Sequence, residues 1–170
     1  PVTALAEGKR EIAQTYQWDG KTKSVQDWLD ITKTTSLVVM RDGVIAHESY
    51  LMGTKPEDKR ISWSMAKSFL SAMFGTVVAD GRIKSLDDTV DAYVPRLKGT
   101  VYEGVTVRNV LRMSSGVKFD EDYEAFDSDI NRMGRVLALG CSMDEFAARL
   151  EAREREQGKA RQYTSIDTHI

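Results

Sequence analysis

Short apolar runs separated by turn residues occupy the first third of the chain and predict strands. Residues 36–40 read Ser-Leu-Val-Val-Met, and residues 44–51 read Val-Ile-Ala-His-Glu-Ser-Tyr-Leu. Between them, Asp42-Gly43 is a pair typical of two-residue hairpin turns, because both residues tolerate the positive φ that such turns require. We therefore expect an antiparallel hairpin in this region. Residues 1–23 show no comparable pattern and are expected to be irregular.

Helical patterns dominate the rest of the chain, and capping residues mark most of their ends. The longest is an apolar stretch over residues 62–80, which Gly81 is placed to end. Residues 117–129 are acidic and are expected to form a solvated loop. Shorter helices are expected after Ser24 and over residues 86–93, 107–113 and 142–156.

The order of these elements indicates the α/β class, with a division near residue 60. Residues 1–60 contribute an N-terminal helix and the first hairpin, and residues 61–170 form a mainly helical region that begins with the longest helix. Two strands do not form an independently stable sheet, which needs a third strand or a covering helix. We therefore expect residues beyond Ile170, or a companion chain, to complete the sheet, so that this chain is part of a larger fold.

The composition is that of an ordinary folded domain and excludes several classes of protein. Of the 170 residues, 41% are hydrophobic and 29% are charged, which excludes a disordered or collagen-like chain. The net charge is -2 with the charges interspersed, so no basic surface for nucleic acid is indicated. No apolar run approaches the roughly 20 residues that span a bilayer. No signal peptide is visible at the start, so the bacterial cytoplasm and the periplasm both stay open.

Cysteine and histidine are too scarce for a disulfide framework or a zinc site. Cys141 is the single cysteine, and the two histidines lie far apart in the sequence. The acidic run that starts at Asp127 has the first ligand positions of a calcium-binding EF-hand loop. Its sixth position is Arg132 and its twelfth is Ala138, where such a loop requires glycine and glutamate. We therefore expect no bound metal.

Two side chains on the longest predicted helix have the spacing of a nucleophile and its base. Ser64 and Lys67 lie three residues apart and so share one face of the helix. Lys67 is the only charged residue between Ile61 and Ala79, and a helix that is apolar nearly all round is normally buried. Burial and the helix dipole both favour the neutral amine, which can take the proton of a serine hydroxyl. The alternative is a capped helix whose lysine extends to water.

Two further patterns are weaker. Ser115 and Lys118 repeat the Ser-x-x-Lys spacing, but they straddle Gly116 and lead into the acidic loop, which indicates a helix end. Tyr163 can carry a proton when a neighbouring ammonium group lowers its pKa, although an ordinary amphipathic tyrosine fits the same pattern. Trp63 either lines a substrate pocket or packs in the core, since both sites favour aromatic side chains.

Several segments, taken in order, resemble the serine β-lactamase-like superfamily. That group includes class C β-lactamases, D,D-peptidases, related esterases and 6-aminohexanoate-dimer hydrolases. Residues 62–69, Ser-Trp-Ser-Met-Ala-Lys-Ser-Phe, resemble its nucleophile helix in the form of the last branch. Residues 105–116 are similar to its helix-to-loop segment, and residues 163–168 to its second catalytic motif in the Tyr-x-Ser form. The resemblance covers roughly residues 35–170 and includes shorter similar stretches at residues 39–45, 80–83, 86–88 and 93–95.

The resemblance implies a fold and a set of roles. The fold is an antiparallel sheet flanked by helices, with a mainly helical region added. By analogy with the family, Ser64 is the acylated nucleophile, Lys67 is its activating base and Tyr163 passes a proton to the leaving group. Ser165 is expected to hydrogen-bond near Lys67 or the substrate, and Trp63 to contact the substrate. No cofactor is implied.

The sequence departs from the family pattern at two places. The usual Pro-Gly-Thr before the tyrosine is replaced by residues 157–161, Gln-Gly-Lys-Ala-Arg. The third family motif, Lys-Thr-Gly or His-x-Gly on a later strand, does not occur in these 170 residues. That strand supplies the second N–H of the oxyanion site in the family.

These observations predict a serine hydrolase that acts on amide, ester or β-lactam bonds through an acyl-enzyme. The Tyr-x-Ser form and Trp63 favour short amides or carboxylic esters as the small-molecule substrate. The alternative is a catalytically silent fragment, or a penicillin-binding-like sensor, that needs further chain to complete its site.

Overall fold

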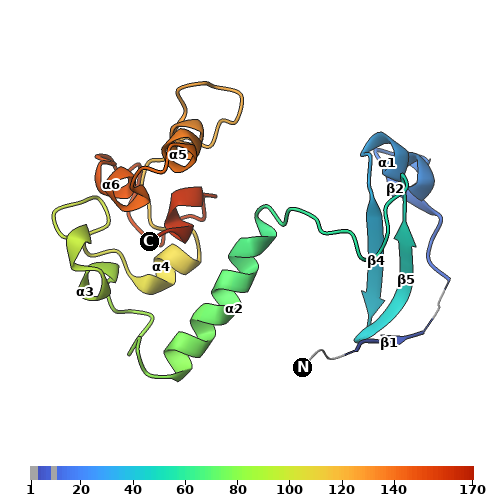
Figure 1. The fold of residues 1–170 in the computed structure, drawn as a ribbon, viewed down its shortest axis with the longest axis horizontal. Coiled ribbons are helices and arrows are strands. Elements are labelled where there is room, and N and C mark those ends of the chain that lie inside the picture. The colour runs from blue at the N-terminus through green and yellow to red at the C-terminus, as the bar shows by residue number, and fades with distance from the viewer. Residues whose placement is uncertain (1–3, 9–10) are drawn as a thin grey trace. The chain divides into compact units, whose positions relative to one another are not determined.

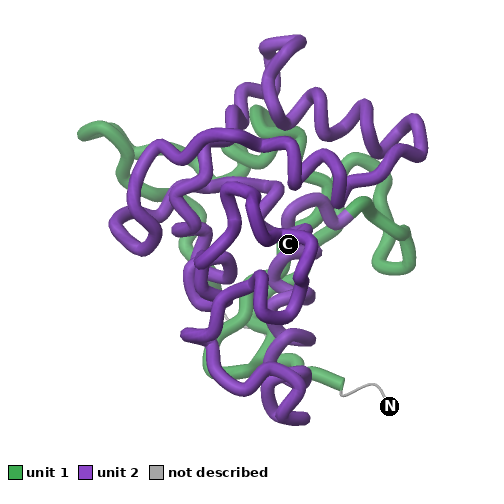
Figure 2. Tube along the Cα trace, turned by 90° about the vertical axis from the view of Figure 1, so that its left-hand side faces the viewer, with its two compact units in different colours: residues 1–61 green, residues 62–170 purple. Residues whose placement is uncertain are grey.

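The structure is a computed structural model that describes residues 4–8 and 11–170 (Figure 1). The chain divides into two compact units, residues 1–61 and residues 62–170 (Figure 2). The strands lie in the first unit and most helices in the second, so the fold class is α/β, as predicted. Within the described residues, no helix combines the length and the apolar character that crossing a membrane requires.

The first unit is built on the predicted hairpin. Strands β4 (Ser36–Arg41) and β5 (Val44–Tyr50) pair antiparallel, and the turn residues Asp42 and Gly43 have φ values of 53° and 75°. Both values lie in the left-handed region that this kind of turn requires. The short strand β1 (Ala6–Glu7) pairs parallel with β5, so the sheet has a third strand within the chain and is mixed rather than purely antiparallel.

A second hairpin lies where the sequence predicts irregular structure. Strands β2 (Thr15–Trp18) and β3 (Lys21–Ser24) pair antiparallel around Asp19 and Gly20, whose φ values are 51° and 69°. An Asp-Gly turn is present here too, but neither strand has a buried residue. The alternation of Tyr16 and Trp18 with polar residues spans a single four-residue strand, and its partner β3 is polar throughout, so the pattern analysis missed both strands. The prediction of an irregular segment is wrong over this range.

The second unit is mainly helical, and its longest helix is α2 (Met65–Ala79). Gly81, with a φ of 73°, follows this helix as predicted. The other elements are α3 (Val90–Tyr93), η1 (Pro95–Leu97), α4 (Val107–Leu111), α5 (Asp129–Ala138), α6 (Met143–Ala148) and η2 (Ser165–Thr168). Helix α5 lies in a stretch for which the sequence analysis predicted no element.

Side-chain caps fix the starts of three predicted helices. The hydroxyl oxygens of Ser24, Thr106 and Ser142 each accept the backbone N–H three residues further on, at 3.2 to 3.3 Å. Each bond satisfies one of the N–H groups that a helix start leaves without an intrahelical partner. These caps open helices α1 (Val25–Ile31), α4 and α6, so the predicted starts are confirmed.

The predicted helix over residues 142–156 is wrong in its second half. Helix α6 ends at Ala148, and beyond it Arg153 forms a β-bridge with Val117. The Arg153 guanidinium also donates to the carbonyl oxygens of Val101 and Glu103, both at 2.7 Å. These long-range contacts outweigh the helix propensity of a charged segment, which is worth only a few tenths of a kcal/mol per residue.

Helix α2 is exposed, which corrects the expectation of a buried helix. Met65, Phe69 and Met73 are each 65% exposed, and none of the helix residues is buried. The helix therefore has the predicted apolar side chains, but no described segment of the second unit covers the face that carries Met65, Phe69 and Met73. Lys67 lies half-buried on the same helix.

The core of the second unit joins segments that are far apart in the sequence. Ile166 of η2 is completely buried together with Tyr102 and Val105 of the 98–106 loop. Helix η2 also lies beside α4 (Figure 1). The chain around residues 163–168 is therefore held by apolar burial, which is the dominant stabilising contribution to a fold.

A buried carboxyl group lies at the centre of this core. Asp167 is 2% exposed, and its Oδ1 accepts hydrogen bonds from the hydroxyl groups of Tyr102 at 2.8 Å and Ser115 at 2.9 Å. Its Oδ2 has no hydrogen-bond partner among the described residues. Burial raises the pKa of Asp167 to about 6, and the two hydroxyl donors only partly oppose that shift. Burial, with the charge of Asp167, likewise raises the pKa of Tyr102.

Asp167 is expected to make stability fall as pH rises. Its pKa is about 6 in the folded chain, against an ordinary value of 3.8. Between these values the folded state keeps a proton that the unfolded chain releases. The free energy of unfolding therefore falls across this window, by up to about 1.4 kcal/mol per pH unit. Urea unfolding followed by circular dichroism at several pH values measures the slope.

Asp167→Asn is the matched variant, because the amide keeps an oxygen acceptor for both hydroxyl groups and cannot titrate. We expect the difference in unfolding free energy between the two proteins to change across the window. An unchanged difference would show that Asp167 does not carry the pH dependence.

Candidate active site

Ser64 lies at the entrance of α2, directly after a strained residue. Trp63 has a φ of 44°, in the left-handed region, which costs a non-glycine residue about 1–3 kcal/mol. Ser64 itself has helical backbone angles, with φ -67° and ψ -6°, and caps the helix through its backbone. Among the described hydrogen bonds, none occupies the Ser64 N–H. That N–H, at the positive end of the helix, is suited to stabilise an anionic oxygen.

Three predicted site residues come together around the Ser64 hydroxyl. Lys67 Nζ donates a hydrogen bond to Ser64 Oγ at 3.1 Å, and the Tyr163 hydroxyl donates to the same oxygen at 2.7 Å. Lys67 Nζ also lies 5.1 Å from the centroid of the Tyr163 ring, within the range of a cation–π contact. Both groups are therefore within the distance at which a general acid or base exchanges a proton with a hydroxyl.

Opposing influences set the pKa of Tyr163. Burial acts to raise it, but hydrogen bonding with Lys67 and Ser64 and the positive charge of Lys67 outweigh that effect. The pKa of Tyr163 therefore lies below its ordinary value of 10.0. The negative charge of Glu121 acts in the opposite direction and limits the shift. A phenol with a lowered pKa gives up its proton more readily at neutral pH.

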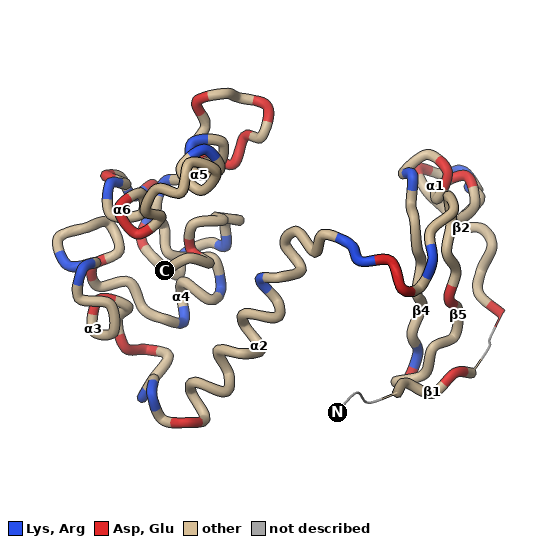
Figure 3. Tube along the Cα trace, in the orientation of Figure 1, with Lys and Arg blue, Asp and Glu red and all other residues tan. Residues whose placement is uncertain are grey.

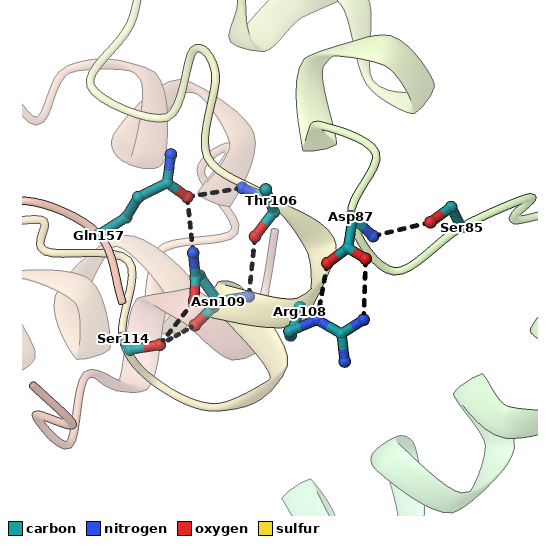
Figure 4. Close-up of polar contacts among 7 residues, drawn as sticks. All are labelled: Ser85, Asp87, Thr106, Arg108, Asn109, Ser114 and Gln157. Atoms are coloured by element: carbon teal, nitrogen blue, oxygen red, sulfur yellow. Dashed lines mark hydrogen bonds and ion pairs between the residues drawn. The ribbon is translucent and has the colours of Figure 1, made fainter. Parts of the chain in front are cut away.

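Gln157, whose contacts with Thr106 and Asn109 are shown in Figure 4, fixes the segment that leads to Tyr163. Its side-chain oxygen accepts the Thr106 N–H at 2.9 Å and the Asn109 amide at 2.8 Å. Its side-chain nitrogen donates to the Gly104 carbonyl at 2.7 Å. Residues 157–161 replace the Pro-Gly-Thr that the resemblance led us to expect, and the polar clamp of Gln157 onto the start of α4 holds this loop.

Two backbone bonds continue the attachment towards the tyrosine. The Gly158 N–H donates to the Ser114 carbonyl, and the Gln162 N–H donates to the Met113 carbonyl, both at 2.8 Å. Met113 has a φ of 52°, so the left-handed residue after α4 is this methionine, and the helix ends at Leu111 rather than Met113. The loop before Tyr163 therefore runs along the chain that follows α4.

Helix α4 is itself tied to the preceding loop. Arg108 donates to both carboxylate oxygens of Asp87, at 2.7 and 3.0 Å (Figure 4). The hydrogen bonding from Arg108 holds the pKa of Asp87 below its ordinary value. Such a two-point pair fixes orientation as well as distance.

Glu121 is a site residue that the sequence analysis missed. Its carboxylate accepts the backbone N–H of Ser165, the Ser165 hydroxyl at 3.3 Å and the Tyr123 hydroxyl at 3.1 Å. The loop over residues 117–129 was expected to be solvated. Glu121 of this loop nevertheless contacts Ser165, which lies 44 residues further along the chain and two residues after Tyr163. No spacing rule links positions so far apart, so the sequence carried no signal for this contact.

The other predicted site residues occupy different surroundings. Among the described contacts, the Ser165 hydroxyl pairs with Glu121 and not with Lys67. Trp63 is 80% exposed, so its side chain does not pack in the core of this unit. The second Ser-x-x-Lys pair is structural, because Ser115 is 2% exposed and donates to Asp167.

The acidic run near Asp127 serves the start of a helix. Ser128 caps α5 by accepting the Asn131 N–H at 3.4 Å, and the Asp129 carboxylate accepts the Asp120 N–H at 2.9 Å. Over the described ranges, no group of three or more histidine, cysteine or acidic side chains is placed to hold a metal ion.

Known proteins resemble this chain in sequence and in fold. The protein family described as Beta-lactamase matches residues 30–169. A curated 6-aminohexanoate-dimer hydrolase from Paenarthrobacter ureafaciens is 34% identical over 95 residues, which are 56% of this chain and 24% of that protein. A solved structure of a Bacillus anthracis protein described as a 6-aminohexanoate-dimer hydrolase matches with a TM-score of 0.78 and 19% identity. The structural match covers 98% of this chain and 46% of the Bacillus anthracis protein. This chain therefore spans less than half the length of either relative.

Removal of the Gln157 side chain is expected to loosen the approach to Tyr163. Gln157→Ala leaves the Thr106 N–H and the Gly104 carbonyl without these partners, which costs about 1–3 kcal/mol. Urea unfolding measures the loss. Gln157→Glu is the comparison variant, because it keeps the oxygen acceptor and replaces the donor to Gly104 by a carboxylate oxygen. We expect an intermediate loss, and equal losses in the two variants would contradict the role of the oxygen.

Glu121→Gln is expected to lower the pKa of Tyr163 further, because it removes a negative charge that raises this pKa. The ring-carbon NMR signal of labelled tyrosine, followed through a pH titration, measures the shift. Glu124→Gln removes the same charge from an exposed position of the same loop and serves as the control. A Tyr163 titration that moves equally in both variants would exclude a specific effect of Glu121.

Proposed function

Since the chain belongs to the Beta-lactamase family, we propose that it carries the nucleophile and proton-transfer groups of a serine hydrolase that works through an acyl-enzyme. The observation that carries this proposal is the Ser64 hydroxyl, which accepts hydrogen bonds from both Lys67 and Tyr163. Family membership supports a hydrolase in general, and the three side chains supply the roles that such chemistry needs.

In the proposed first step, Ser64 Oγ attacks the substrate carbonyl while its proton passes to the neutral amine of Lys67. The new Oγ–C bond gives a tetrahedral intermediate, whose oxyanion the Ser64 N–H stabilises. Collapse of the intermediate breaks the bond to the leaving group, which takes a proton from the Tyr163 hydroxyl. Lys67 then returns its proton to Tyr163, so the acyl-enzyme forms with no net gain or loss of protons.

In the second step, water attacks the Ser64 ester. The same two groups take the water proton and return one to Ser64 Oγ, which releases the acid product. The short distances from Ser64 Oγ to Lys67 Nζ and Tyr163 Oη support a relay through this oxygen in both directions.

We propose short linear amides or carboxylic esters as the first substrates to test. The relatives are named for a 6-aminohexanoate dimer, and that name favours an amide over a β-lactam. Trp63 is exposed beside Ser64 and is available to contact the acyl or leaving group. We assign Ser165 a positioning role through Glu121 instead of a role beside Lys67.

We further propose that polypeptide outside these residues completes the site. The apolar face of α2 is exposed, and the chain covers 46% of its solved relative. The covering segment, either a continuation of the chain or a companion chain, would supply the second oxyanion N–H. If no such segment exists, the exposed apolar face of α2 favours the alternative function, a catalytically silent or penicillin-binding-like protein.

Labelling with a fluorophosphonate, followed by intact mass measurement, tests the assignment. We expect a single adduct that Ser64→Ala abolishes. Ser68→Ala, a change of the same kind at an exposed position of the same helix, should leave the adduct unchanged. An adduct on the 19.1 kDa species would show that these residues alone assemble the nucleophile. An adduct found only on a heavier species would show that further polypeptide is required.

Lys67→Ala should slow formation of the adduct by at least about a hundredfold, the scale of general-base catalysis. Circular dichroism of the variant checks that α2 still forms. Labelling of the folded variant at the wild-type rate would overturn the assignment of Lys67 as the base.

A further inference from the structure

Helices α5 and α6 line an open hollow that the proposed function does not use. Its volume is about 400 Å³, and the chain lining it comes entirely from residues 132–150. This volume lies in the range of small-molecule sites in proteins. The hollow shares no lining residue with the group formed by Ser64, Lys67 and Tyr163.

Three arginines are among the residues that line the hollow. Arg132 and Arg135 come from α5, and Arg149 follows the end of α6. Figure 3 shows basic positions along α5 and acidic positions in the loop before it. Each guanidinium keeps its positive charge at any physiological pH and offers five N–H donors in a planar fork. Groups of this kind at a hollow are suited to hold a carboxylate.

The ion pairs of these arginines leave guanidinium donors free, since the Arg132, Arg135 and Arg149 side chains are 51%, 39% and 80% exposed. The ion pairs are Arg132–Asp129 at 3.2 Å, Arg149–Glu145 at 3.3 Å and Arg135–Asp127 at 3.8 Å. The Glu145 and Asp127 side chains are 69% and 88% exposed, and exposed pairs of this kind contribute about 0–1 kcal/mol. Asp129 is only 18% exposed, so Arg132 keeps this partner and offers its other donors to a ligand. A ligand carboxylate that reaches two guanidinium groups at once can therefore compete with them.

The remaining wall is apolar. Val136 and Leu139 face it from α5 and its end, and Phe146 and Leu150 from α6 and its end. Leu139 is 78% exposed, so a ligand tail would remove apolar surface from water. A small inorganic anion would leave this surface uncovered, whereas an acid with an alkyl chain would cover it.

We propose that the hollow between α5 and α6 binds an amphiphilic carboxylate, with its headgroup on Arg132 and Arg149 and its alkyl chain against Leu139 and Phe146. The proposal is independent of the proposed function, because it involves none of the same residues. The ligand class is a straight-chain fatty acid of medium length.

Cys141 provides a direct measure of occupancy. It is the single cysteine of the chain, it is exposed, and it lines the same hollow. Its rate of alkylation by the uncharged reagent N-ethylmaleimide reports access to the hollow and does not require an active enzyme. Octanoate is the probe, with 1-octanol as its uncharged match and acetate as the headgroup alone.

We expect octanoate to slow alkylation about tenfold when its concentration is ten times its Kd, as mass action requires if the bound ligand covers the thiol. Neither 1-octanol nor acetate should protect at the same concentrations. Protection by 1-octanol equal to that by octanoate would overturn the role of the arginines. Absence of protection at about 20 mM octanoate, well above a millimolar Kd, would overturn the site itself.

The double variant Arg132→Gln with Arg149→Gln tests the headgroup contact. Arg135 is retained, because it donates to the Phe126 carbonyl at 2.8 Å and its guanidinium lies 4.3 Å from the Phe126 ring. We expect the Kd for octanoate to rise about tenfold or more through loss of charge-assisted hydrogen bonds. Arg82→Gln, an exposed change of the same kind outside the hollow, should leave the Kd unchanged.

A second readout locates the ligand. Amide NMR signals of Cys141 and Phe146 should shift with octanoate in the wild type, and circular dichroism confirms that the double variant is folded. Full protection in the folded double variant, or octanoate shifts confined to other regions, would overturn the proposal.

Discussion

The hydrogen bond from Tyr163 to Ser64 joins residues that are 99 positions apart, and the candidate site exists only while it is held. Closing a loop of that length costs conformational entropy that one hydrogen bond cannot offset. The closure therefore depends on burial elsewhere. Ile166, three residues after Tyr163, is completely buried beside Tyr102, so the apolar core of the second unit brings the tyrosine towards the helix that carries the serine.

Polar contacts on both sides of Tyr163 turn that closeness into a defined geometry. Before the tyrosine, Gln157 is clamped to the start of α4; after it, Glu121 holds Ser165 and Asp167 accepts two buried hydroxyl donors. Apolar burial has no direction, whereas each of these hydrogen bonds fixes an orientation. Burial disfavours the charged form of the Asp167 carboxyl group and raises its pKa. The two hydroxyl donors to one of its oxygens fix the orientation of this segment.

The sequence predicted those parts of the molecule whose signal is local. Ser64 and Lys67 share a helix turn, and the caps at Ser24 and Ser142 act over three residues, so spacing alone indicates them. The hairpin around Gly20 was missed because its strands are only four residues long and neither has a buried residue. The contacts of Gln157, Glu121 and Arg153 join positions about 44 to 53 residues apart, and no periodicity encodes such pairs. Tyr163 was found only because an ordered family resemblance supplied that long-range information.

The exposed apolar face of α2 connects stability with catalysis. An amine acts as a base in its neutral form, and removal of water favours that form. In this chain Lys67 is only half-buried, on a helix whose large apolar side chains face solvent. A segment that covered those side chains would bury apolar surface and desolvate the lysine in the same event. Under the proposed function, completion of the fold and activation of the nucleophile are thus one physical step, because the surface that needs covering is the surface that carries the base.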